Sequence, residues 1–414
     1  MRVGIVGAGL SGLTLAWLLE GVCETTVLEA GERAGGAMRS VHVSVADRDA
    51  TVDLGAQDIS GDLFPLHRAL LRATGLDRHV VGSPASLTVR RAGEAVPLLV
   101  SPHTPESRLP RRTVLGPAWD GIGLFLDRAR AMDAADESWE TPLADLVEPL
   151  PVSEAIKRDV LYARSAFLFC CGVEQARELS ARAAIAFYAN KDGEPGWQHL
   201  ATGLESLAWA LAAQSPSATI RTGAGVREVR RSGAGFEVLD TAGERRWFDE
   251  LVLAVPPWAA LPILGPLAGT GELRDTLRAF EYVNATYALH LDPAYLPPDR
   301  RHWSTSTFEV HDGWSESTDW FGPSHGVDVF KSQITHRRPP PGQVIAQARY
   351  RHLLITPAAV RARRHLARLS GHGGLHFAGH HTNWVSSQES AVRSAVEAAR
   401  RIAPRSARLS GLTA

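Results

Sequence analysis

Residues 2–12, which read RVGIVGAGLSG, decide the fold of this chain. The apolar run over residues 2–6 has the length and composition of a buried strand, and Gly7, Gly9 and Gly12 follow it in G-x-G-x-x-G spacing. The apolar residues 13–19 then continue as a buried helix. In this order the first glycine makes a tight turn, the second lets a pyrophosphate approach the backbone, and the third lets helix and strand pack closely. The stretch predicts a dinucleotide-binding βαβ unit.

The next strand supports this reading over turn chemistry alone. Residues 25–28, TTVL, read as the next strand, and it is followed by Glu29, seventeen positions beyond Gly12. A carboxylate at this place can accept hydrogen bonds from a ribose diol. The backbone around Ala8, Leu10 and Ser11 would offer unpaired helix amides and a positive dipole end to the phosphates. These features predict a bound dinucleotide without deciding between FAD and NAD.

Two following segments favour FAD. Residues 29–36, EAGERAGG, resemble the second glycine motif of the flavin amine oxidases and their relatives, and residues 53–57, DLGAQ, resemble the element that follows it in that family. A nicotinamide-dependent dehydrogenase has no need of either segment. The resemblance implies FAD contacts in both segments, at Ala30, Arg33, Gly35, Gly36, Ala37, Met38, Arg39, Gly55, Ala56 and Gln57.

Later segments extend the resemblance in the expected order. Residues 197–211 resemble the glycine turn and helix that re-enter the FAD domain, and residues 219–226, 236–239 and 246–251 read as strands of a small sheet. Residues 253–257, LAVPP, and 375–382, LHFAGHHT, resemble the family's segments beside the flavin, and a helix over 386–401 follows. Its first amides would stabilise negative charge that develops on the reduced flavin. The resemblance implies further cofactor contacts at Val226, Ala254, Pro256, Gly379, His380, Gln388, Glu389 and Ala391.

The predicted fold class is α/β, with a discontinuous Rossmann-type FAD-binding domain and an α+β substrate-binding domain. The FAD-binding domain is expected to comprise residues 1–75, 197–265 and 370–405, and the substrate-binding domain residues 76–196 and 266–369. Within the latter, apolar spacing predicts helices over 154–169 and 175–188, and alternation predicts strands over 286–291 and 327–335. The tail after Pro404 is expected to fray.

The catalytic residues are left open because the chain departs from the family at two places. Many amine-oxidising relatives carry a lysine near the flavin on a strand of the substrate domain, but the matching residues 282–287, YVNATY, contain none. Lys331 on a later strand could replace it, although a solvated or salt-bridged surface lysine is the commoner arrangement. The tyrosine of the family's aromatic cage falls near Ser387, so the cage is absent. Trp384 could project toward the pocket instead, or could be buried by packing.

Other pocket candidates rest on position alone. His380 and His381 lie beside a flavin motif, where His380 replaces the acidic residue common in the family, and Tyr350 and His352 lie on the strand before the last FAD segment. An aromatic group in the substrate half could be packed core or could line a cavity for a flat or apolar substrate. Its members are Trp303, Phe308, Trp314, Trp320 and Phe321.

Composition excludes several classes of protein. The net charge of −1, from 44 basic and 45 acidic residues, offers no field for nucleic acid or an anionic membrane. No run reaches the roughly 18 apolar residues of a membrane span. The three cysteines, Cys23, Cys170 and Cys171, have neither disulfide nor metal-site spacing. We therefore expect a cytoplasmic protein with no metal site and a small-molecule partner.

The combined prediction is a FAD-dependent oxidase or dehydrogenase that removes hydride from a small organic substrate, by C–N oxidation or C–C desaturation. Its electrons would pass to O2 or another acceptor, and its setting would be bacterial specialised metabolism. A FAD-dependent isomerase or cyclase without net oxidation is the main alternative, and a non-catalytic FAD-binding escort protein is the next. The substrate and the oligomeric state stay open.

Overall fold

The computed structural model describes residues 1–101, 116–187, 196–265 and 267–413. Its first half is built on a five-stranded sheet with the order β10-β2-β1-β14-β20, and every neighbouring pair in it is parallel. The strands are β1 (Arg2–Val6), β2 (Glu24–Leu28), β10 (Thr219–Arg221), β14 (Glu250–Leu253) and β20 (Leu375–Phe377). The sheet thus gathers segments from both ends and the middle of the chain, as predicted for a discontinuous Rossmann-type domain.

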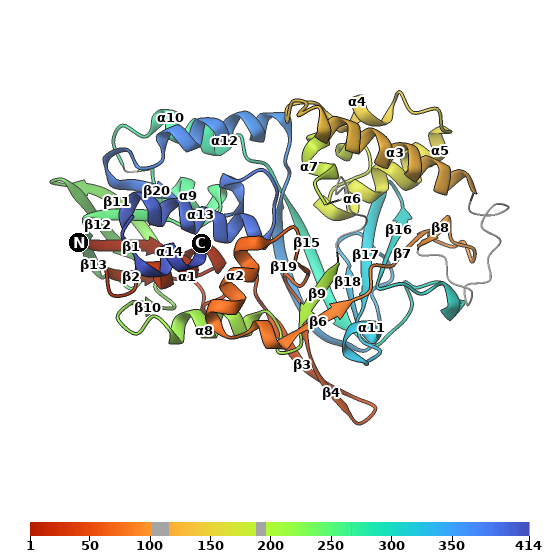
Figure 1. Ribbon diagram of the computed structural model, residues 1–414, viewed down its shortest axis with the longest axis horizontal. Coiled ribbons are helices and arrows are strands. Elements are labelled where there is room, and N and C mark those ends of the chain that lie inside the picture. Colours follow the sequence, from red (N-terminus) through yellow and green to blue (C-terminus); the bar gives the residue numbers. More distant parts are fainter. Residues whose placement is uncertain (102–115, 188–195, 266, 414) are drawn as a thin grey trace.

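Helices cover this sheet (Figure 1). They are α1 (Leu10–Leu18), α2 (Pro65–Thr74), α8 (Glu205–Ala213), α13 (Gln388–Ile402) and α14 (Ala407–Thr413). All nine residues of α1 are buried, because α8 and α13 pack against it. The expectation of a frayed tail was wrong: α14 contacts α1 and α2, and it buries Leu409 and Leu412.

A three-stranded antiparallel sheet branches from the parallel one. It contains β11 (Val226–Ser232), β12 (Gly235–Asp240) and β13 (Arg245–Phe248). The two longer strands predicted over 219–226 and 246–251 were wrong, since each is divided between the two sheets. The chain changes sheet at Gly223, where φ is +63°, and at Asp249, whose amide donates to the Arg2 carbonyl.

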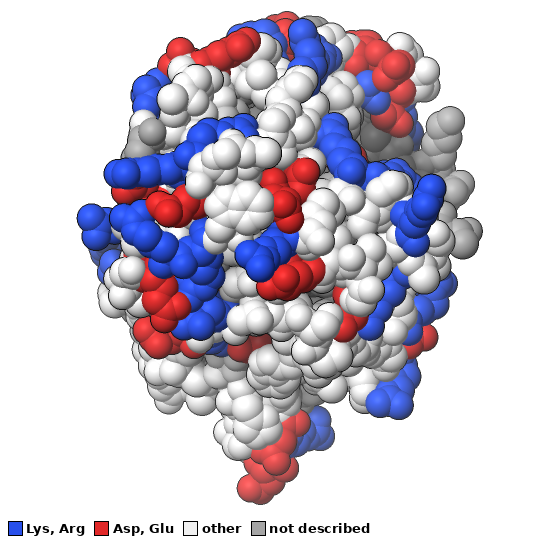
Figure 2. Space-filling model, turned by 90° about the vertical axis from the view of Figure 1, so that its left-hand side faces the viewer, with Lys and Arg blue, Asp and Glu red and all other residues white. Residues whose placement is uncertain are grey.

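Ion pairs link the strands of this small sheet. Arg246 bonds Asp240 at 2.6 Å and also pairs with Glu244, and Arg245 pairs with Glu237. Figure 2 views the molecule from this end and shows basic and acidic side chains interspersed over the face. Neither sign of charge dominates this surface.

The second half is built on a seven-stranded mixed sheet with the order β19-β15-β18-β17-β16-β7-β8. Its neighbours are antiparallel except β16 and β7, which are parallel. The strands are β7 (Leu87–Arg91), β8 (Leu99–Ser101), β15 (Tyr282–His290), β16 (Ser306–His311), β17 (Trp314–Trp320), β18 (Phe330–Gln333) and β19 (Val344–Leu353). The long pair β15 and β19 lies between the two halves in Figure 1.

A helical layer caps one end of this sheet, at the upper right of Figure 1. It contains α3 (Gly116–Ala134), α4 (Leu143–Val147), α5 (Glu154–Ile156), α6 (Ala163–Phe169) and α7 (Ala181–Ile185). The helix predicted over 154–169 is present, with a π-helical segment at Lys157–Tyr162. The helix predicted over 175–188 was wrong, because the chain turns extended at Leu179 and restarts at the Ser180 cap; Tyr188 lies outside the described residues.

The remaining elements connect the two halves. They are the hairpin β3 (Ser40–Val45) and β4 (Arg48–Asp53), the small sheet of β5 (Ile59–Ser60), β9 (Trp197–Leu200) and β6 (Val80–Ser83), and the helices α9 (Pro257–Ile263), α10 (Gly271–Arg278), α11 (Gly322–His325) and α12 (Pro357–Leu369). The residue boundaries of the two domains stay a proposal, and β6 and β9 pair across the proposed boundary. Among the described residues, no helix has both the length and the apolarity to cross a bilayer.

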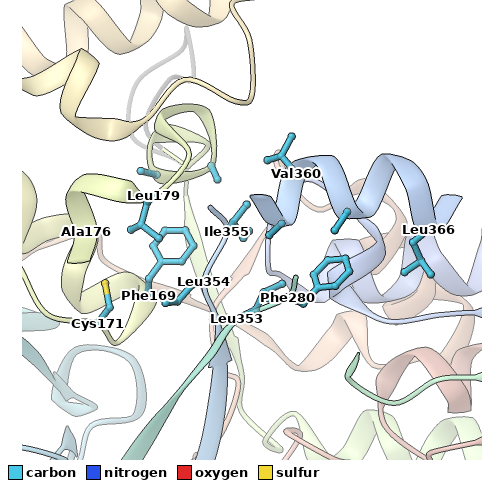
Figure 3. Close-up of a cluster of buried hydrophobic side chains, with 14 of the residues drawn as sticks. Phe169, Cys171, Ala176, Leu179, Phe280, Leu353, Leu354, Ile355, Val360 and Leu366 are labelled. Carbon is cyan, nitrogen blue, oxygen red and sulfur yellow. The ribbon is translucent and has the colours of Figure 1, made fainter. Parts of the chain in front are cut away.

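A continuous apolar core joins the halves. Figure 3 shows Phe169 and Leu179 of the helical cap in one cluster with Leu353–Ile355 at the end of β19. The same cluster continues to Phe280 and into α12. Because this core is unbroken, it fixes the position of the helical cap relative to the parallel sheet.

Candidate active site

The glycine turn after β1 has the geometry that the sequence predicts for a phosphate-binding loop. Gly7 has φ +100°, and a Cβ there would lie 2.7 Å from the Val255 side chain. A Cβ on Gly12 would lie 2.0 Å from the Gly7 carbonyl oxygen, so only glycine lets α1 approach this closely. A Cβ on Gly9 would meet open space, and Gly9 lines a cavity. The N-terminus of α1 therefore faces that cavity with unblocked amides.

Glu29 closes the adjacent edge of the cavity. Its Oε2 accepts the Ala8 amide at 2.7 Å, and its Oε1 accepts the Gly31 amide at 2.8 Å. A carboxylate has about four acceptor positions, so lone pairs remain for a diol in the cavity. The amides hold the carboxylate in place, as an acceptor for a ribose would require.

The second glycine segment packs directly on the first. Gly35 donates to the Ala8 carbonyl at 2.8 Å, and a Cβ on Gly36 would lie 3.1 Å from the Gly9 Cα. Gly36 also has φ +58°, which side chains rarely adopt. Farther along, a Cβ on Gly55 would lie 1.9 Å from the Ala37 carbonyl oxygen. These glycines form a backbone cradle that is open to the cavity.

The last strand and helix complete the cradle. Gly379 follows β20 with φ +136°, and its amide donates to Ser394 Oγ at 2.8 Å. Ser387 caps α13 by accepting the Ser390 amide at 3.2 Å, and Gln388 donates to the Asp58 carbonyl at 3.0 Å. The N-terminus of α13 thus meets the same cavity as that of α1.

The cavity has a volume of about 1340 Å³. Ordinary small-molecule pockets have roughly 300–1,000 Å³, so this one has room for a dinucleotide and a second molecule. The predicted cofactor residues that line it are Gly7, Gly9, Leu10, Ser11, Glu29, Ala30, Gly35, Gly36, Ala37, Met38, Gly55, Ala56, Gln57, Ala254, Pro256, Gly379, His380, Gln388 and Ala391. The open cradle, the two helix ends and the placed carboxylate fit a dinucleotide cofactor.

Six predicted cofactor residues do not line the cavity. They are Ala8, Gly12, Arg33, Arg39, Val226 and Glu389. Arg33 bonds Glu205 at 2.6 Å, and Glu389 accepts the His67 amide at 3.0 Å. Ala8 and Gly12 act through the turn itself, as their backbone contacts show.

Lys331 lies inside the site, so its interpretation as a surface lysine was wrong. It is 5% exposed and lines the cavity from β18. Its Nζ donates to the Gly55 carbonyl at 3.2 Å, bonds Gln57 Oε1, and lies 3.6 Å from Asp319 Oδ2. The location of Lys331 could not be predicted from its position in the sequence, because β18 reaches the site only through its pairing with β15 and β17.

Four other candidate residues also line the cavity. Burial lowers the pKa of His380 to about 4 and lowers that of His352, so both rings are neutral near pH 7. Burial raises the pKa of Tyr350 to about 12, and its hydroxyl has no hydrogen-bond partner within the described part of the chain. His381 lines the cavity as well, and burial lowers its pKa to about 3. These groups are neutral hydrogen-bond donors or acceptors in the cavity wall.

Trp384 does not line the cavity, which contradicts the expectation that it projects there. Its ring lies 5.0 Å from that of Trp139, and the Arg363 guanidinium lies 3.2 Å from its centroid. The side chain is 37% exposed on the far side of the η7 turn (His380–Thr382). Stacking between Trp139 and Arg363 therefore directs it away from the site.

Only part of the predicted aromatic group lines the cavity. Trp320 and Phe321 line the cavity, whereas Trp303, Trp314 and Phe308 do not. Five aromatic side chains that the sequence did not single out also line the cavity: Phe64, Phe167, Phe187, Trp197 and Trp258. No local motif marks them, because they come from separate elements.

Sequence reasoning also missed a charged cluster. Asp58, His199 and Asp319 line the cavity around Gln57, whose Nε2 donates to Asp319 at 3.2 Å and lies 3.5 Å from Asp58 Oδ1. Burial raises the pKa of Asp319, and the charge of Asp58 adds to this while Lys331 opposes it. The only signal in the sequence was the position of Asp58, directly after the flavin-like segment 53–57.

Comparisons with known proteins agree with this geometry. Residues 10–346 and 343–403 match the sequence profile of a family described as flavin containing amine oxidoreductase. Among solved structures, a putative protoporphyrinogen oxidase from Exiguobacterium sp. 255-15 is similar, with TM-score 0.66 and 16% identity over 97% of this chain and 98% of that one.

Two further structures share the fold. A putrescine oxidase bound to putrescine has TM-score 0.66 and 18% identity over 98% of this chain and 100% of that one. A fatty acid isomerase from P. acnes that produces CLA has TM-score 0.67 and 14% identity over 97% of this chain and 98% of that one. At these identities the likeness concerns the fold alone.

Proposed function

The chain belongs to the family of flavin-containing amine oxidoreductases, and we propose that it removes hydride from a small organic substrate bound in the large cavity. The family match gives an FAD-dependent enzyme; the reaction and the substrate are our proposal. One observation carries it: a single cavity joins the glycine cradle of the parallel sheet to an aromatic and charged wall of the mixed sheet. A cofactor and a substrate can therefore meet in one space.

The residues of the cradle would hold the cofactor. Glu29 would bind the adenosine ribose, and the amides at Gly9–Ser11 and around Gly36 would bind the pyrophosphate. When bound, FAD would supply the hydride acceptor, which no side chain can provide. The amino end of α13 would stabilise negative charge on the reduced ring system.

The wall of the mixed sheet would bind and orient the substrate. Trp320, Phe321 and Phe187 present rings to the cavity, which favours a substrate with a flat or apolar part. Lys331 is held by Gly55 and Gln57 within the same wall, and we propose it as the lysine of the site in place of the missing one on β15. Excluding water from this space strengthens every polar contact within it.

The stretch matched to the strand of the family lysine, residues 282–287, contains no lysine, and its Asn284 lines the cavity. The position matched to the cage tyrosine carries Ser387, which caps α13. Because both places differ from amine-catabolising relatives, we propose C–N oxidation or C–C desaturation of a small organic metabolite in bacterial specialised biosynthesis. O2 or another acceptor would then reoxidise the enzyme, and we expect it to act in the cytoplasm.

The test is an anaerobic screen of amines, amino acids and aromatic metabolites, read as loss of the visible flavin absorbance. We expect a fast substrate with an aromatic or apolar part, and Trp320→Leu should raise its KM more than Trp303→Leu does. If simple primary amines were the fastest substrates, the biosynthetic assignment would be wrong. A preparation that cannot be reconstituted with FAD would refute the whole proposal.

Isomerisation without net oxidation is the second candidate. A structure with the same fold is that of a fatty acid isomerase, and the apolar part of the wall suits a lipid chain as well as an aromatic ring. The two candidates differ in redox balance. Products isomeric with the substrate, formed without peroxide or any other reduced acceptor, would favour isomerisation.

A further inference from the structure

Asp58 presents one open carboxylate oxygen to the cavity. Its side chain is 52% accessible, and the residue lines the cavity wall. Both polar contacts of this carboxylate use Oδ1, which lies 3.0 Å from His199 Nε2 and 3.5 Å from Gln57 Nε2. No residue that the structure describes donates a hydrogen bond to Oδ2. The lone pairs of Oδ2 are therefore left for a molecule in the cavity.

Hydrogen bonds behind His199 fix it as a donor to Asp58. His199 Nδ1 lies 3.3 Å from Ser324 Oγ, and the same hydroxyl lies 2.9 Å from His325 Nδ1. Burial lowers the pKa of His325 to about 4, so this ring is neutral and its Nδ1–H donates to Ser324. Ser324 in turn donates to His199 Nδ1, which places the His199 proton on Nε2. A neutral imidazole thus holds the carboxylate in place through Oδ1.

The nearby charges leave Asp58 without a full counter-ion. Lys331 Nζ lies 3.6 Å from Asp319 Oδ2, so its charge is directed at Asp319. No lysine or arginine in the described part of the chain forms an ion pair with Asp58. Burial raises the pKa of Asp58, but its interactions with His199 and Lys331 outweigh burial, so the pKa lies below its ordinary value. Asp58 is consequently ionised at neutral pH, and its negative charge faces the cavity.

Aromatic rings lie next to this carboxylate. Trp197 and His199 are two residues apart on β9, so their side chains point to the same face of the small sheet. The register of β5 with β9, continued by one residue pair, sets Asp58 opposite His199 and diagonal to Trp197. The rings of Phe187 and Phe64 lie 6.0 Å and 6.4 Å from that of Trp197. All three rings line the same cavity as Asp58.

A cationic group suits this part of the wall better than an anionic or an uncharged one. A protonated or quaternary ammonium would place its charge at Asp58 Oδ2, and the faces of the neighbouring rings would attract the same charge. A carboxylate or a phosphate would meet Asp58 as a like charge. A hydroxyl would leave the charge of Asp58 without a counter-ion in a space shielded from water, where that charge acts most strongly.

We propose that Asp58 and the rings of Trp197, Phe187 and Phe64 form a subsite for a positively charged nitrogen of the substrate. This inference rests on the proposed function, because the subsite and the glycine cradle belong to one cavity. An ammonium nitrogen has no lone pair to assist the loss of hydride from its own carbon. The oxidised bond therefore lies elsewhere in the substrate, which combines a cationic group with a separate reacting group.

The experiment compares two ligands of equal shape by isothermal titration calorimetry with the FAD-loaded enzyme. One is 3-hydroxyphenyltrimethylammonium, whose charge is permanent, and the other is its uncharged isostere 3-tert-butylphenol. We expect the unaltered enzyme to bind the cation at least about tenfold more tightly. Asp58→Asn should weaken binding of the cation by about tenfold and leave binding of the phenol unchanged. Asp62→Asn removes the same charge from an exposed residue outside the cavity wall and should change neither affinity.

Two further variants separate recognition of charge from a structural role. Asp58→Glu keeps the charge and should keep the preference for the cation, and Trp197→Leu should weaken binding of the cation more than that of the phenol. Equal binding of the two ligands by the unaltered enzyme, or binding of neither, would overturn the subsite. So would an equal loss of both ligands in Asp58→Asn. Binding requires no turnover, so failure of the substrate screen would leave this readout unaffected.

Discussion

Replacement of Lys331 by methionine tests whether this lysine is an integral part of the site. Methionine has a similar length but cannot donate, so Gly55 and Gln57 would lose a donor and Asp319 would lose its nearest cation. At the observed 3.6 Å, an ion pair is worth about 5 kcal/mol before desolvation, with an effective dielectric constant of about 20. Breaking one side of a buried pair typically costs about 3–5 kcal/mol. We therefore expect Lys331→Met to destabilise the enzyme by at least about 3 kcal/mol.

The assay is thermal unfolding at a fixed excess of FAD, because ligand binding itself shifts Tm. For a chain of 414 residues, a loss of this size should lower Tm by roughly 3–6 °C. Arg405→Met removes a positive charge from an exposed position and serves as the control, with almost no expected change. Adding Asp319→Asn to Lys331→Met should recover part of the loss, since the pair is coupled by about 0.5–3 kcal/mol.

Two results would refute this reasoning. A Tm of Lys331→Met equal to that of the control would mean that the lysine is effectively solvated. Strict additivity of Lys331→Met and Asp319→Asn would mean that the two groups do not interact, whatever their distance. Either outcome would also remove Lys331 from the proposed substrate wall.

Three other predictions follow from the described contacts. Burial lowers the pKa of His67 to about 4, so between pH 6.5 and about 4 the unfolded chain binds more protons than the folded one, and acid should destabilise the fold by up to about 3 kcal/mol. In His67→Phe, the unfolding free energy measured in urea should fall less steeply as the pH is lowered. A pH dependence equal to that of the unaltered protein would contradict this prediction. Gly9→Val should keep the Tm of the FAD-free protein but abolish FAD retention on gel filtration, whereas Gly12→Ala should lower both; equal behaviour of the two would disprove the cradle. Trp384→Phe should leave the flavin-bleaching rate unchanged while Trp320→Leu slows it, and the reverse order would place the substrate elsewhere.

The sequence predicted the parts of the molecule whose structure depends on local backbone chemistry. The turn at Gly7, Gly9 and Gly12 depends on these glycines and little on the rest of the fold. Glu29 follows at a distance set by one helix and one strand. Gly36 and Gly379, which the resemblance implied as cofactor contacts, have positive φ angles and line the cavity. For these residues, their spacing in the sequence was enough to predict the geometry.

The sequence could not predict contacts made by pairing of remote strands. Asp319 and Lys331 are directly opposite each other on β17 and β18, yet nothing in their local sequence marks them as partners. The exposure of Trp384 depends on Trp139 and Arg363, which lie far away in the chain. The division of residues 246–251 between two sheets likewise depends on the bend at Asp249 and not on strand propensity.

The unbroken apolar core around Leu353–Ile355 has a consequence for how the enzyme opens. A two-lobed protein whose lobes meet across water can swing apart to admit its substrate, but here such a swing would expose Phe169, Leu179 and Phe280 to solvent. Entry and exit must then depend on local movements of loops and side chains at the rim. A chain cut into its two halves should therefore not yield separately stable proteins.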